Sequence, residues 1–277
     1  MKKIVLTGAN GNLGQELRGL LAGLCDELVS TDIAEGVGAL LQNETFVQAD
    51  LSEMDQVRPL LEGAEMVVHF GAIVDELPFD QMWGPNFMGS YNIWESARQL
   101  GVRRVVYASS IHAMGMYPKT TRIDTEMPHR PDTYYGFAKC FTEDLGRMYW
   151  EKEGIESVHL RIYSATSKPG NARALGSWLS FDDLRQLVAR SIDTPVVGFT
   201  VVYGVSNNDR CPVDNSAAAF LGYRPKDNAE IYAEEVFAKE PAADLSDLGQ
   251  TCHGGPFASA VLGVSPMGQM AIPDKED

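Results

Sequence analysis

The chain has 277 residues, of which 44% are hydrophobic and 22% are charged, and its formal net charge at pH 7 is −15. These values are typical of a globular protein with one domain, or one domain and a small lobe. Because nucleic acids and anionic membrane surfaces repel an acidic protein, we exclude both as partners. An anionic substrate would need a local basic group, because the overall negative charge of the protein repels it.

The cysteines predict a reducing compartment. Cys25, Cys140, Cys211 and Cys252 show neither a C-x-x-C spacing nor a paired pattern. We therefore expect reduced thiols, a cytoplasmic location and no metal site. The first residues, MKKIVLTG, reach a glycine too soon for a signal peptide, and no apolar run approaches the roughly 18 residues of a membrane span.

The chain begins with a strand, a glycine turn and a helix. Residues 3–7, KIVLT, have the short β-branched pattern of a buried strand, and a helical pattern follows at 15–24. Between them, GANGNLG contains Gly8, Gly11 and Gly14. Glycines at such a turn let the backbone approach a pyrophosphate, which the helix N-terminus binds. The spacing differs from the common G-x-G-x-x-G, but its position directly after a strand predicts a dinucleotide site. The residues expected to bind the cofactor here are Gly8, Asn10, Gly11, Asn12 and Leu13.

Acidic residues end the next two predicted strands. Residues 27–33, ELVSTDI, contain Asp32 near the strand end. A carboxylate there accepts hydrogen bonds from the adenosine ribose hydroxyls and repels a 2′-phosphate, which favours NAD over NADP. Residues 45–52, TFVQADLS, predict a third strand. Asp50 after it can read the adenine amino group, while Leu51 covers the ring.

Small and amide residues follow on the same side of the predicted sheet. Residues 65–74, EMVVHFGAIV, predict a fourth strand with Gly71 and Ala72 at its end, where a cofactor can lie close over the sheet. A helix from about 80 to 100 contains Asn86. A buried amide needs a hydrogen-bond partner. We assign Asn86 to the cofactor side, where it holds backbone near the active site or is simply exposed.

The strongest chemical signals come next. Residues 103–115, RRVVYASSIHAMG, predict a fifth strand with Ser110 at its carboxyl end, where parallel sheets place ligand chemistry and a hydroxyl can donate to a reacting oxygen. In PDTYYGFAKCFTE, Tyr135 and Lys139 are four residues apart, so both lie on one face of a helix. A lysine ammonium beside a tyrosine favours the phenolate, so the pair can remove a proton from an alcohol. Tyr134 is out of register with Lys139.

The alternation of strands and helices predicts an α/β fold, a Rossmann-type doubly wound parallel sheet. A sixth strand is expected in 156–166, and after 165 the pattern loosens. We expect residues 1–165 to form the cofactor domain with the catalytic residues. Residues 166–240 are expected to form a small C-terminal substrate lobe packed at its rim, and 241–277 an irregular tail.

Seven features occur in order along the chain: GANGNLG, Asp32, Asp50-Leu51, HFGA, NFMGSYN, ASSIH and YGFAK. Over residues 1–165 the chain therefore resembles the extended short-chain dehydrogenases/reductases that modify sugars, within the NAD-dependent epimerase/dehydratase superfamily. The resemblance implies NAD as cofactor and a catalytic set of Ser110, Tyr135 and Lys139. Tyr135 would be the base, Ser110 would hold the reacting oxygen, and Lys139 would lower the tyrosine pKa and bind the nicotinamide ribose.

A narrower resemblance reaches to about residue 240. Residues 117–145, the segment with SWLSFDD, and TVVYGVS with FLGYRP are similar to the bacterial uronate dehydrogenases. This resemblance implies oxidation of the anomeric carbon of glucuronate or galacturonate to an aldarolactone, and a homo-oligomer. It also places the substrate carboxylate at Ser164 and Arg173, where a planar guanidinium suits bidentate binding.

The chain departs from that family at the sugar-reading positions. The family usually has Ser-Asn-His at Ser110-Ile111-His112, a serine at Val74 and a glycine at Tyr163. Losing a hydrogen bond to a buried hydroxyl costs about 1–3 kcal/mol, so the change concerns the identity of the sugar more than the reaction. The expected substrate-binding residues are Val74, Ser110, Ile111, His112, Ser164 and Arg173.

Three alternatives stay open from the sequence. The same chemistry can act on a sulfonated or phosphorylated hexose, which Arg173 would bind equally well. An epimerase or dehydratase that retains NAD would use the same residues on a nucleotide sugar, although the C-terminal part is small for that substrate. A non-catalytic NAD sensor would need no base, and the intact Tyr135 argues against it.

Overall fold

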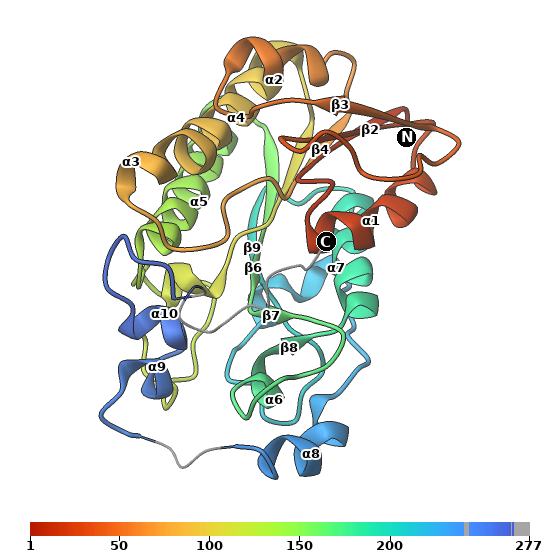
Figure 1. Ribbon diagram of the computed structural model, residues 1–277. Helices are drawn as coiled ribbons and strands as arrows, with labels where there is room; N and C mark the ends of the chain where they lie inside the picture. Colours follow the sequence, from red (N-terminus) through yellow and green to blue (C-terminus); the bar gives the residue numbers. More distant parts are fainter. Residues whose placement is uncertain (241–243, 267, 269–277) are drawn as a thin grey trace.

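The computed structural model describes residues 1–240, 244–266 and 268. A seven-stranded parallel sheet of order β3-β2-β1-β4-β5-β6-β9 lies at its centre, between two layers of helices (Figure 1). The strands of this sheet are β1 (Lys3–Thr7), β2 (Glu27–Asp32), β3 (Glu44–Gln48), β4 (Met66–His69), β5 (Arg104–Tyr107), β6 (Glu156–Ile162) and β9 (Phe199–Gly204). The first six positions have the Rossmann order, so the predicted fold class is confirmed.

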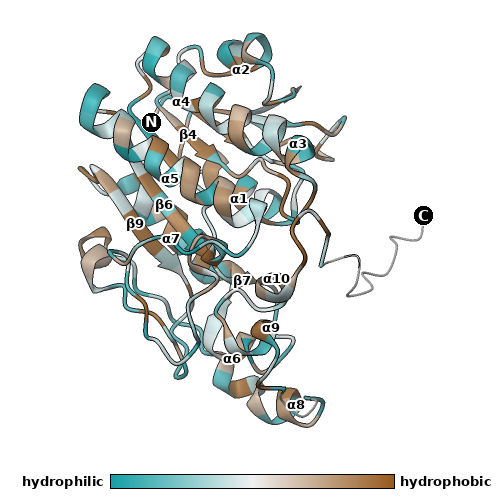
Figure 2. Cartoon of the chain, turned by 90° about the vertical axis from the view of Figure 1, so that its left-hand side faces the viewer, coloured by the Kyte–Doolittle hydropathy of each residue, from teal (hydrophilic) through white to brown (hydrophobic). Residues whose placement is uncertain are grey.

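Each face of the sheet buries its own core. One layer consists of α1 (Asn12–Ala22) and α7 (Phe181–Asp193), and the other of α2 (Met54–Leu60), α4 (Gly89–Leu100) and α5 (Tyr134–Glu153). Side chains alternate along a strand, so Ile4 and Leu6 of β1 face the first layer and Val5 the second. All three are fully buried, and each such side chain contributes about 1.5–3 kcal/mol. Figure 2 shows these hydrophobic strands between helices whose outer faces are hydrophilic.

The predicted substrate lobe was wrong in part. Residues 166–240 do contain small elements at the carboxyl edge of the sheet, namely β8 (Trp178–Leu179), which pairs with β7 (Ser164–Ala165), α6 (Ala174–Ser177) and α8 (Ala233–Phe237). However, α7 packs against α1, and β9 pairs with β6 as the seventh strand of the main sheet. Both α7 and β9 bury apolar faces, so they complete the cofactor domain.

A segment after residue 240 is attached to the body of the protein. Residues 248–259, which we call the C-terminal strap, contain α9 (Leu248–Thr251) and α10 (Pro256–Ser259). Within the strap, the His253 N–H donates to the Tyr117 carbonyl and the Gly254 N–H to the Gly115 carbonyl, both at 2.9 Å. The predicted irregular tail was therefore wrong for the strap, and residues 241–243, 267 and 269–277 lie outside the described residues.

Two further observations concern the helices and the cysteines. In the parts of the chain that the structure describes, none of the helices is both long and apolar enough to cross a membrane. The four cysteines carry free thiols.

Candidate active site

The turn between β1 and α1 is shaped so that only glycine fits. Gly8 has φ +68°, and a Cβ atom on it would come within 2.6 Å of the backbone of Phe70 and Gly71. A Cβ on Gly14 would lie 2.0 Å from the Gly8 carbonyl oxygen. The ends of β1 and β4 therefore meet closely. No side chain caps α1 at Gly11, so the first N–H groups of the helix are open to an anion such as a pyrophosphate.

Asp32 ends β2 beside this turn. Its carboxylate oxygens accept hydrogen bonds from the N–H groups of Asn10 at 2.9 Å and Ala34 at 3.1 Å. Each oxygen keeps a free lone pair, which suits the two hydroxyls of a ribose. The nearby Arg18 guanidinium is already bound by Glu44 at 2.6 and 2.7 Å, so it is not free for a 2′-phosphate. These groups fit NAD better than NADP.

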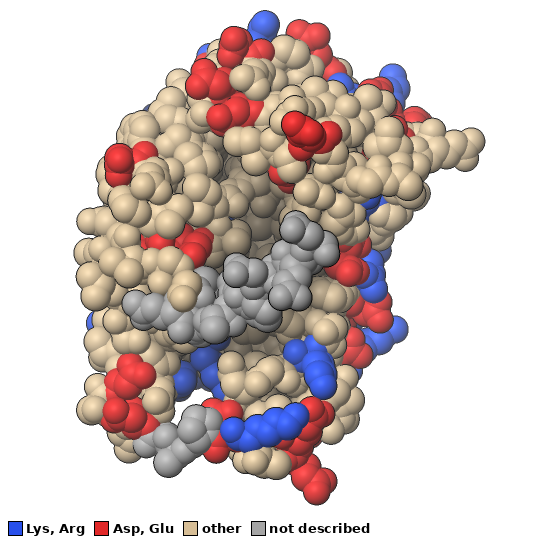
Figure 3. Space-filling model, viewed as in Figure 1, with Lys and Arg blue, Asp and Glu red and all other residues tan. Residues whose placement is uncertain are grey.

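A cavity of about 1060 Å³ lies along the carboxyl ends of the strands, where Figure 3 shows the surface hollowed. Ligand pockets commonly measure about 300–1,000 Å³, so the cavity has room for a dinucleotide and a small substrate. The predicted site residues that line it are Gly8, Asn10, Gly11, Asn12, Leu13, Asp32, Asp50, Leu51, Gly71, Ala72, Val74, Ser110, His112, Tyr135, Lys139, Ser164 and Arg173.

Ser110, Tyr135 and Lys139 meet in this cavity from two elements. Ser110 follows β5 and begins a short 3-10 turn, where its hydroxyl accepts from the His112 N–H at 3.2 Å. Tyr135 and Lys139 lie one turn apart on α5, with Lys139 Nζ 5.2 Å from the centre of the Tyr135 ring. Lys139 Nζ also donates to the Ala108 carbonyl at 2.7 Å. The structure thus brings the predicted catalytic residues together.

Burial controls the protonation of the pair. Burial raises the pKa of Tyr135 to about 12; the Ser110 hydroxyl opposes this shift and the Asp132 charge adds to it. Burial also lowers the pKa of Lys139 to about 7, although the Glu143 carboxylate acts in the opposite direction. The sequence predicted that Lys139 lowers the tyrosine pKa. In the structure burial is the largest cause of the raised pKa, so the neutral phenol is favoured at pH 7, and a lowering of the tyrosine pKa by Lys139 stays a prediction.

A buried carboxylate on α5 itself holds this helix against the sheet. Glu143, one turn after Lys139, accepts hydrogen bonds from the Ser109 hydroxyl at 2.5 Å and from Arg161 at 2.8 and 3.1 Å. Burial opposes ionisation, but the Arg161 guanidinium and the His129 ring hold the pKa of Glu143 well below its usual range. This anion fixes α5 against the ends of β5 and β6.

The N-terminus of α5 is held by a second carboxylate. Glu76, which is fully buried, accepts from the N–H groups of Tyr134 at 3.2 Å and Tyr135 at 3.0 Å. The Thr133 hydroxyl caps the same end of the helix. Glu76 also accepts from the Gly263 N–H at 2.8 Å. Free N–H groups at a helix start are thereby satisfied, and the backbone of Tyr135 is fixed.

Arg173 lies at the other end of the cavity. Its guanidinium donates to the His253 carbonyl through Nε at 3.2 Å and Nη2 at 2.6 Å, and Nη1 lies 3.4 Å from the Ser164 hydroxyl. These partners in the described part of the chain include no carboxylate. A guanidinium has five N–H donors, so several remain for an anion. Burial lowers the pKa of Arg173, whose ordinary value is so high that the group stays charged.

His112 forms the wall between the two ends. Its Nδ1 lies 2.7 Å from the Asp132 carboxylate, which orients the ring. The imidazole lies against Phe257 of the strap, with ring centres 4.2 Å apart, and edge-on to Tyr135 at 5.5 Å. The site therefore has a polar edge at His112 and an aromatic cover from the strap.

Comparison with known proteins places this geometry in a family. The profile of the NAD dependent epimerase/dehydratase family matches residues 4–181. The chain belongs to the NAD dependent epimerase/dehydratase family. It is 42% identical to a uronate dehydrogenase of Pseudomonas putida, over 93% of this chain and 96% of that protein. It is 32% identical to an NAD-dependent glucose-6-phosphate dehydrogenase of Haloferax volcanii, over 86% of this chain and 97% of that protein.

A solved structure agrees with these relatives. A tyrosine-to-alanine mutant of uronate dehydrogenase from Agrobacterium tumefaciens, complexed with NAD, superposes with a TM-score of 0.90. Its sequence is 40% identical, and the match covers 94% of this chain and 98% of that chain. Both resemblances predicted from the sequence, to the NAD dependent epimerase/dehydratase family and to the uronate dehydrogenases, are confirmed.

Two predicted site residues do not line the cavity. Asn86 is 3% exposed, and its amide both donates to and accepts from the Ile73 backbone at 2.9 Å. It lies in a π-helical turn, Trp83–Met88, that joins α3 (Phe79–Met82) to α4 within the predicted helix. Asn86 therefore fixes the loop that lines the cavity instead of touching a cofactor. The interpretation that it holds backbone was the right one.

Ile111 is the second correction. Its side chain is 1% exposed and packs in a core with Met114, Ile123 and Tyr203. The 3-10 turn after Ser110 points Ile111 inward and His112 toward the cavity. Of the three positions at which the chain departs from the uronate dehydrogenases, only Val74 and Tyr163 line the cavity. Val74 is 63% exposed.

The sequence did not reveal several residues of the site. Gly254, Pro256 and Phe257 of the strap line the cavity, and the carboxylates of Asp132 and Glu76 hold its residues in place. The available signal was the Gly254-Gly255-Pro256 run, which is unusual in a tail. A Cβ on Gly254 would lie 1.9 Å from an Asp132 oxygen, so glycine is needed there.

Proposed function

We propose that this protein oxidises the anomeric carbon of a uronate, glucuronate or galacturonate, to the aldarolactone with NAD. The observation that carries the proposal is that one cavity joins the glycine turn, the trio Ser110, Tyr135 and Lys139, and a charged Arg173 without a carboxylate partner in the described residues. The names of the relatives in Pseudomonas and Agrobacterium support the same reaction.

Each end of the cavity has its own task. The N–H groups at the start of α1 would bind the pyrophosphate, and Asp32 the adenosine ribose. The chemistry that NAD supplies when bound is acceptance of the hydride from C1. At the other end, Arg173 and Ser164 would bind the sugar carboxylate, because a guanidinium pairs with it in a bidentate manner. These contacts would place C1 between the two ends.

Tyr135 would remove the proton of the C1 hydroxyl. The Ser110 hydroxyl would donate to the same oxygen, and Lys139 Nζ would stabilise the phenolate once the tyrosine is ionised. Because burial raises the pKa of Tyr135 to about 12, the phenolate becomes more abundant as pH rises. The backbone hydrogen bond from Tyr135 to Glu76 fixes the position of the ring during this transfer.

The substrate panel that tests the proposal contains glucuronate, galacturonate, glucose 6-phosphate, sulfoquinovose and glucose. NADH formation at 340 nm is measured with protein shown to bind NAD. We expect turnover with at least one uronate, and much weaker turnover with glucose, which lacks an anion for Arg173. No activity with either uronate would contradict the proposal. Activity confined to the phosphate or the sulfonate would transfer it to another anionic hexose.

The assembly and the location of the protein are proposals as well. We infer a homo-oligomer because Phe79, Trp83 and Phe137 expose 39–49% of their surface in a contiguous aromatic patch over α3 and α5. Light scattering of Phe137→Glu should give a smaller particle than wild type, and Val196→Glu, at an exposed apolar residue elsewhere, should not. Free cysteines support a cytoplasmic location, which fractionation of the source cells would test.

A further inference from the structure

We propose that His253 and Tyr163 are positioning residues for Arg173. The Tyr163 hydroxyl holds the His253 ring, and the backbone carbonyl of His253 holds the Arg173 guanidinium, which we call the Arg173 clamp. The proposal rests on the proposed function, in that it assumes an anionic substrate at Arg173. It gives a role to two residues outside the predicted set of substrate-binding residues. One lies in the C-terminal strap, and the other directly follows β6.

The ring of His253 is fixed at both nitrogens. Nε2 lies 2.9 Å from the Thr121 carbonyl oxygen, which can only accept, so Nε2 carries a hydrogen. Burial lowers the pKa of His253; the hydrogen bond to Thr121 opposes this shift and the charges of Arg173 and Lys119 add to it, so the neutral ring is favoured. Nδ1 is then an acceptor, and the Tyr163 hydroxyl 2.9 Å away donates to it. The direction of both hydrogen bonds is thereby determined: Tyr163 donates to His253, and His253 donates to Thr121.

The backbone of the same residue orients the guanidinium. The His253 carbonyl accepts from Arg173 Nε and Nη2, which uses one edge of the planar group. The Tyr163 ring lies 5.8 Å from the guanidinium carbon, in a cation–π arrangement. Gly255, at φ +62°, packs against the group so closely that a Cβ would come 2.9 Å from Nε. The edge formed by Nη1 and the outer hydrogen of Nη2 remains for a carboxylate.

The hydrogen bonds from Tyr163 to His253 and from His253 to Thr121 join three separate segments of the chain. Tyr163 follows β6, Thr121 lies in the loop before α5, and His253 belongs to the strap. Without the ring contacts, the His253 carbonyl keeps only its backbone restraints, so Arg173 is less well ordered before the substrate binds. Ordering a flexible side chain at binding weakens affinity. The effect falls on carboxylate binding, while Tyr135 and the cofactor end are untouched.

Steady-state kinetics with the better uronate, in the full chain, tests the proposal. Tyr163→Phe removes one hydroxyl, and His253→Leu removes the ring but keeps the backbone carbonyl. We expect the KM for the uronate to rise about 3- to 10-fold in Tyr163→Phe and about 10- to 30-fold in His253→Leu, with kcat and the KM for NAD nearly unchanged. Tyr223→Phe is the matched control, because its buried hydroxyl donates to the Val205 carbonyl at 2.8 Å, away from Arg173.

A double-mutant cycle separates positioning from a general structural effect. In an Arg173→Met background, Tyr163→Phe should have no further effect on the KM for the uronate, because the clamp is already absent. The same fold-change in both backgrounds, or an unchanged KM in both single variants, would overturn the proposal while leaving the proposed function intact. Wild-type protein that oxidises neither uronate would overturn both.

Discussion

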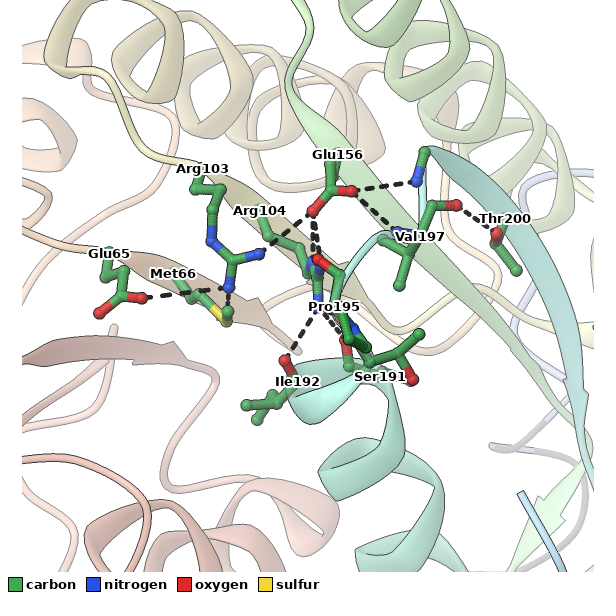
Figure 4. Close-up of polar contacts among 12 residues, drawn as sticks. Glu65, Met66, Arg103, Arg104, Glu156, Ser191, Ile192, Pro195, Val197 and Thr200 are labelled. Carbon is green, nitrogen blue, oxygen red and sulfur yellow. Dashed lines mark hydrogen bonds and ion pairs between the residues drawn. The ribbon is translucent and has the colours of Figure 1, made fainter. Parts of the chain in front are cut away.

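Arg104, which is buried, and Arg173, which is partly exposed, lie at opposite ends of the strands of the same sheet. They differ in how many of their hydrogen-bond donors are used. Arg104 begins β5 at the amino edge and is fully buried. Figure 4 shows its guanidinium among the Glu156 carboxylate and backbone carbonyls at the end of α7. Nε and Nη2 donate to Glu156 at 3.0 and 2.5 Å. The remaining donors reach the carbonyls of Ser191, Ile192, Thr194 and Pro195.

Arg104 therefore closes the last turn of α7 and has no donor to spare. Arg173, at the carboxyl edge, bonds one carbonyl and one distant hydroxyl in the described part of the chain. A buried cation whose donors are all satisfied stabilises the fold, and one with free donors is available for a ligand. The comparison indicates that the amino edge of the sheet maintains structure, while the carboxyl edge binds and reacts.

The largest expected effect comes from the carboxyl edge. Tyr135→Phe removes the base, and general base catalysis commonly contributes about 10²- to 10⁴-fold, so kcat should fall by about 10³-fold. NAD affinity should stay within a few-fold, and the melting temperature should not fall. Tyr134→Phe is the matched control and should keep its activity. A Tyr135→Phe variant with wild-type turnover would show that another group is the base.

The pH dependence should also separate the two edges. Because the pKa of Tyr135 is raised to about 12, ionisation of the base should make kcat/KM rise from pH 7 to 9. The pKa of Lys139 is lowered to about 7, so loss of its ammonium over the same range should keep the rise well below tenfold per unit. Although burial opposes it, Arg104 keeps the pKa of Glu156 below its usual value. That pair therefore stabilises the protein above the unfolded carboxyl pKa and is lost only as pH falls toward acid. Stability measured by urea unfolding should not decline between pH 7 and 9. A kcat/KM that falls over this range would contradict the assignment.

Replacing each of the two arginines by methionine tests the comparison directly. Arg173→Met should lower kcat/KM for the uronate about 10- to 100-fold, because a charge-assisted hydrogen bond contributes about 1.5–3 kcal/mol. Its free energy of unfolding should stay near that of wild type. Arg104→Met leaves Glu156 with the more exposed Arg103 as its remaining cation and leaves the carbonyls at the end of α7 unpaired. It should cost up to about 3–5 kcal/mol of stability, with activity per folded molecule unchanged. Urea unfolding and kinetics on both variants give the result, and a reversed pattern would refute the comparison.

The cofactor half could be predicted because its signals are local. Strand, glycine turn and helix follow one another in the chain, so Gly8 and Asp32 were assigned from neighbouring residues alone. Tyr135 and Lys139 share a helix, and one turn of spacing places them together. Ser110 could be placed because parallel strands end at a common edge.

The rest depends on contacts between distant segments. Ile111 and His112 are adjacent, and only the packing of the 3-10 turn decides which of them faces the cavity. Glu76 lies 59 residues before the Tyr135 N–H that it binds, and Arg173 lies 80 residues before the His253 carbonyl. No periodicity in the sequence reports such pairs. The strap lacks a helical pattern because its glycines are required by close approach to Asp132 and Arg173.

The smallest expected effect comes from Val74, the remaining apolar substitution on the cavity wall. A serine at this exposed position can bond a sugar hydroxyl, so Val74→Ser should raise kcat/KM for a uronate about 3- to 10-fold, the equivalent of one net hydrogen bond. Ile111→Asn provides the contrast, because it would place an amide in the core and should cost about 1–3 kcal/mol of stability without improving kcat/KM. If Ile111→Asn improved turnover and Val74→Ser did not, the sugar would contact the turn after Ser110. The carboxyl edge would then be arranged differently from the geometry described for His112.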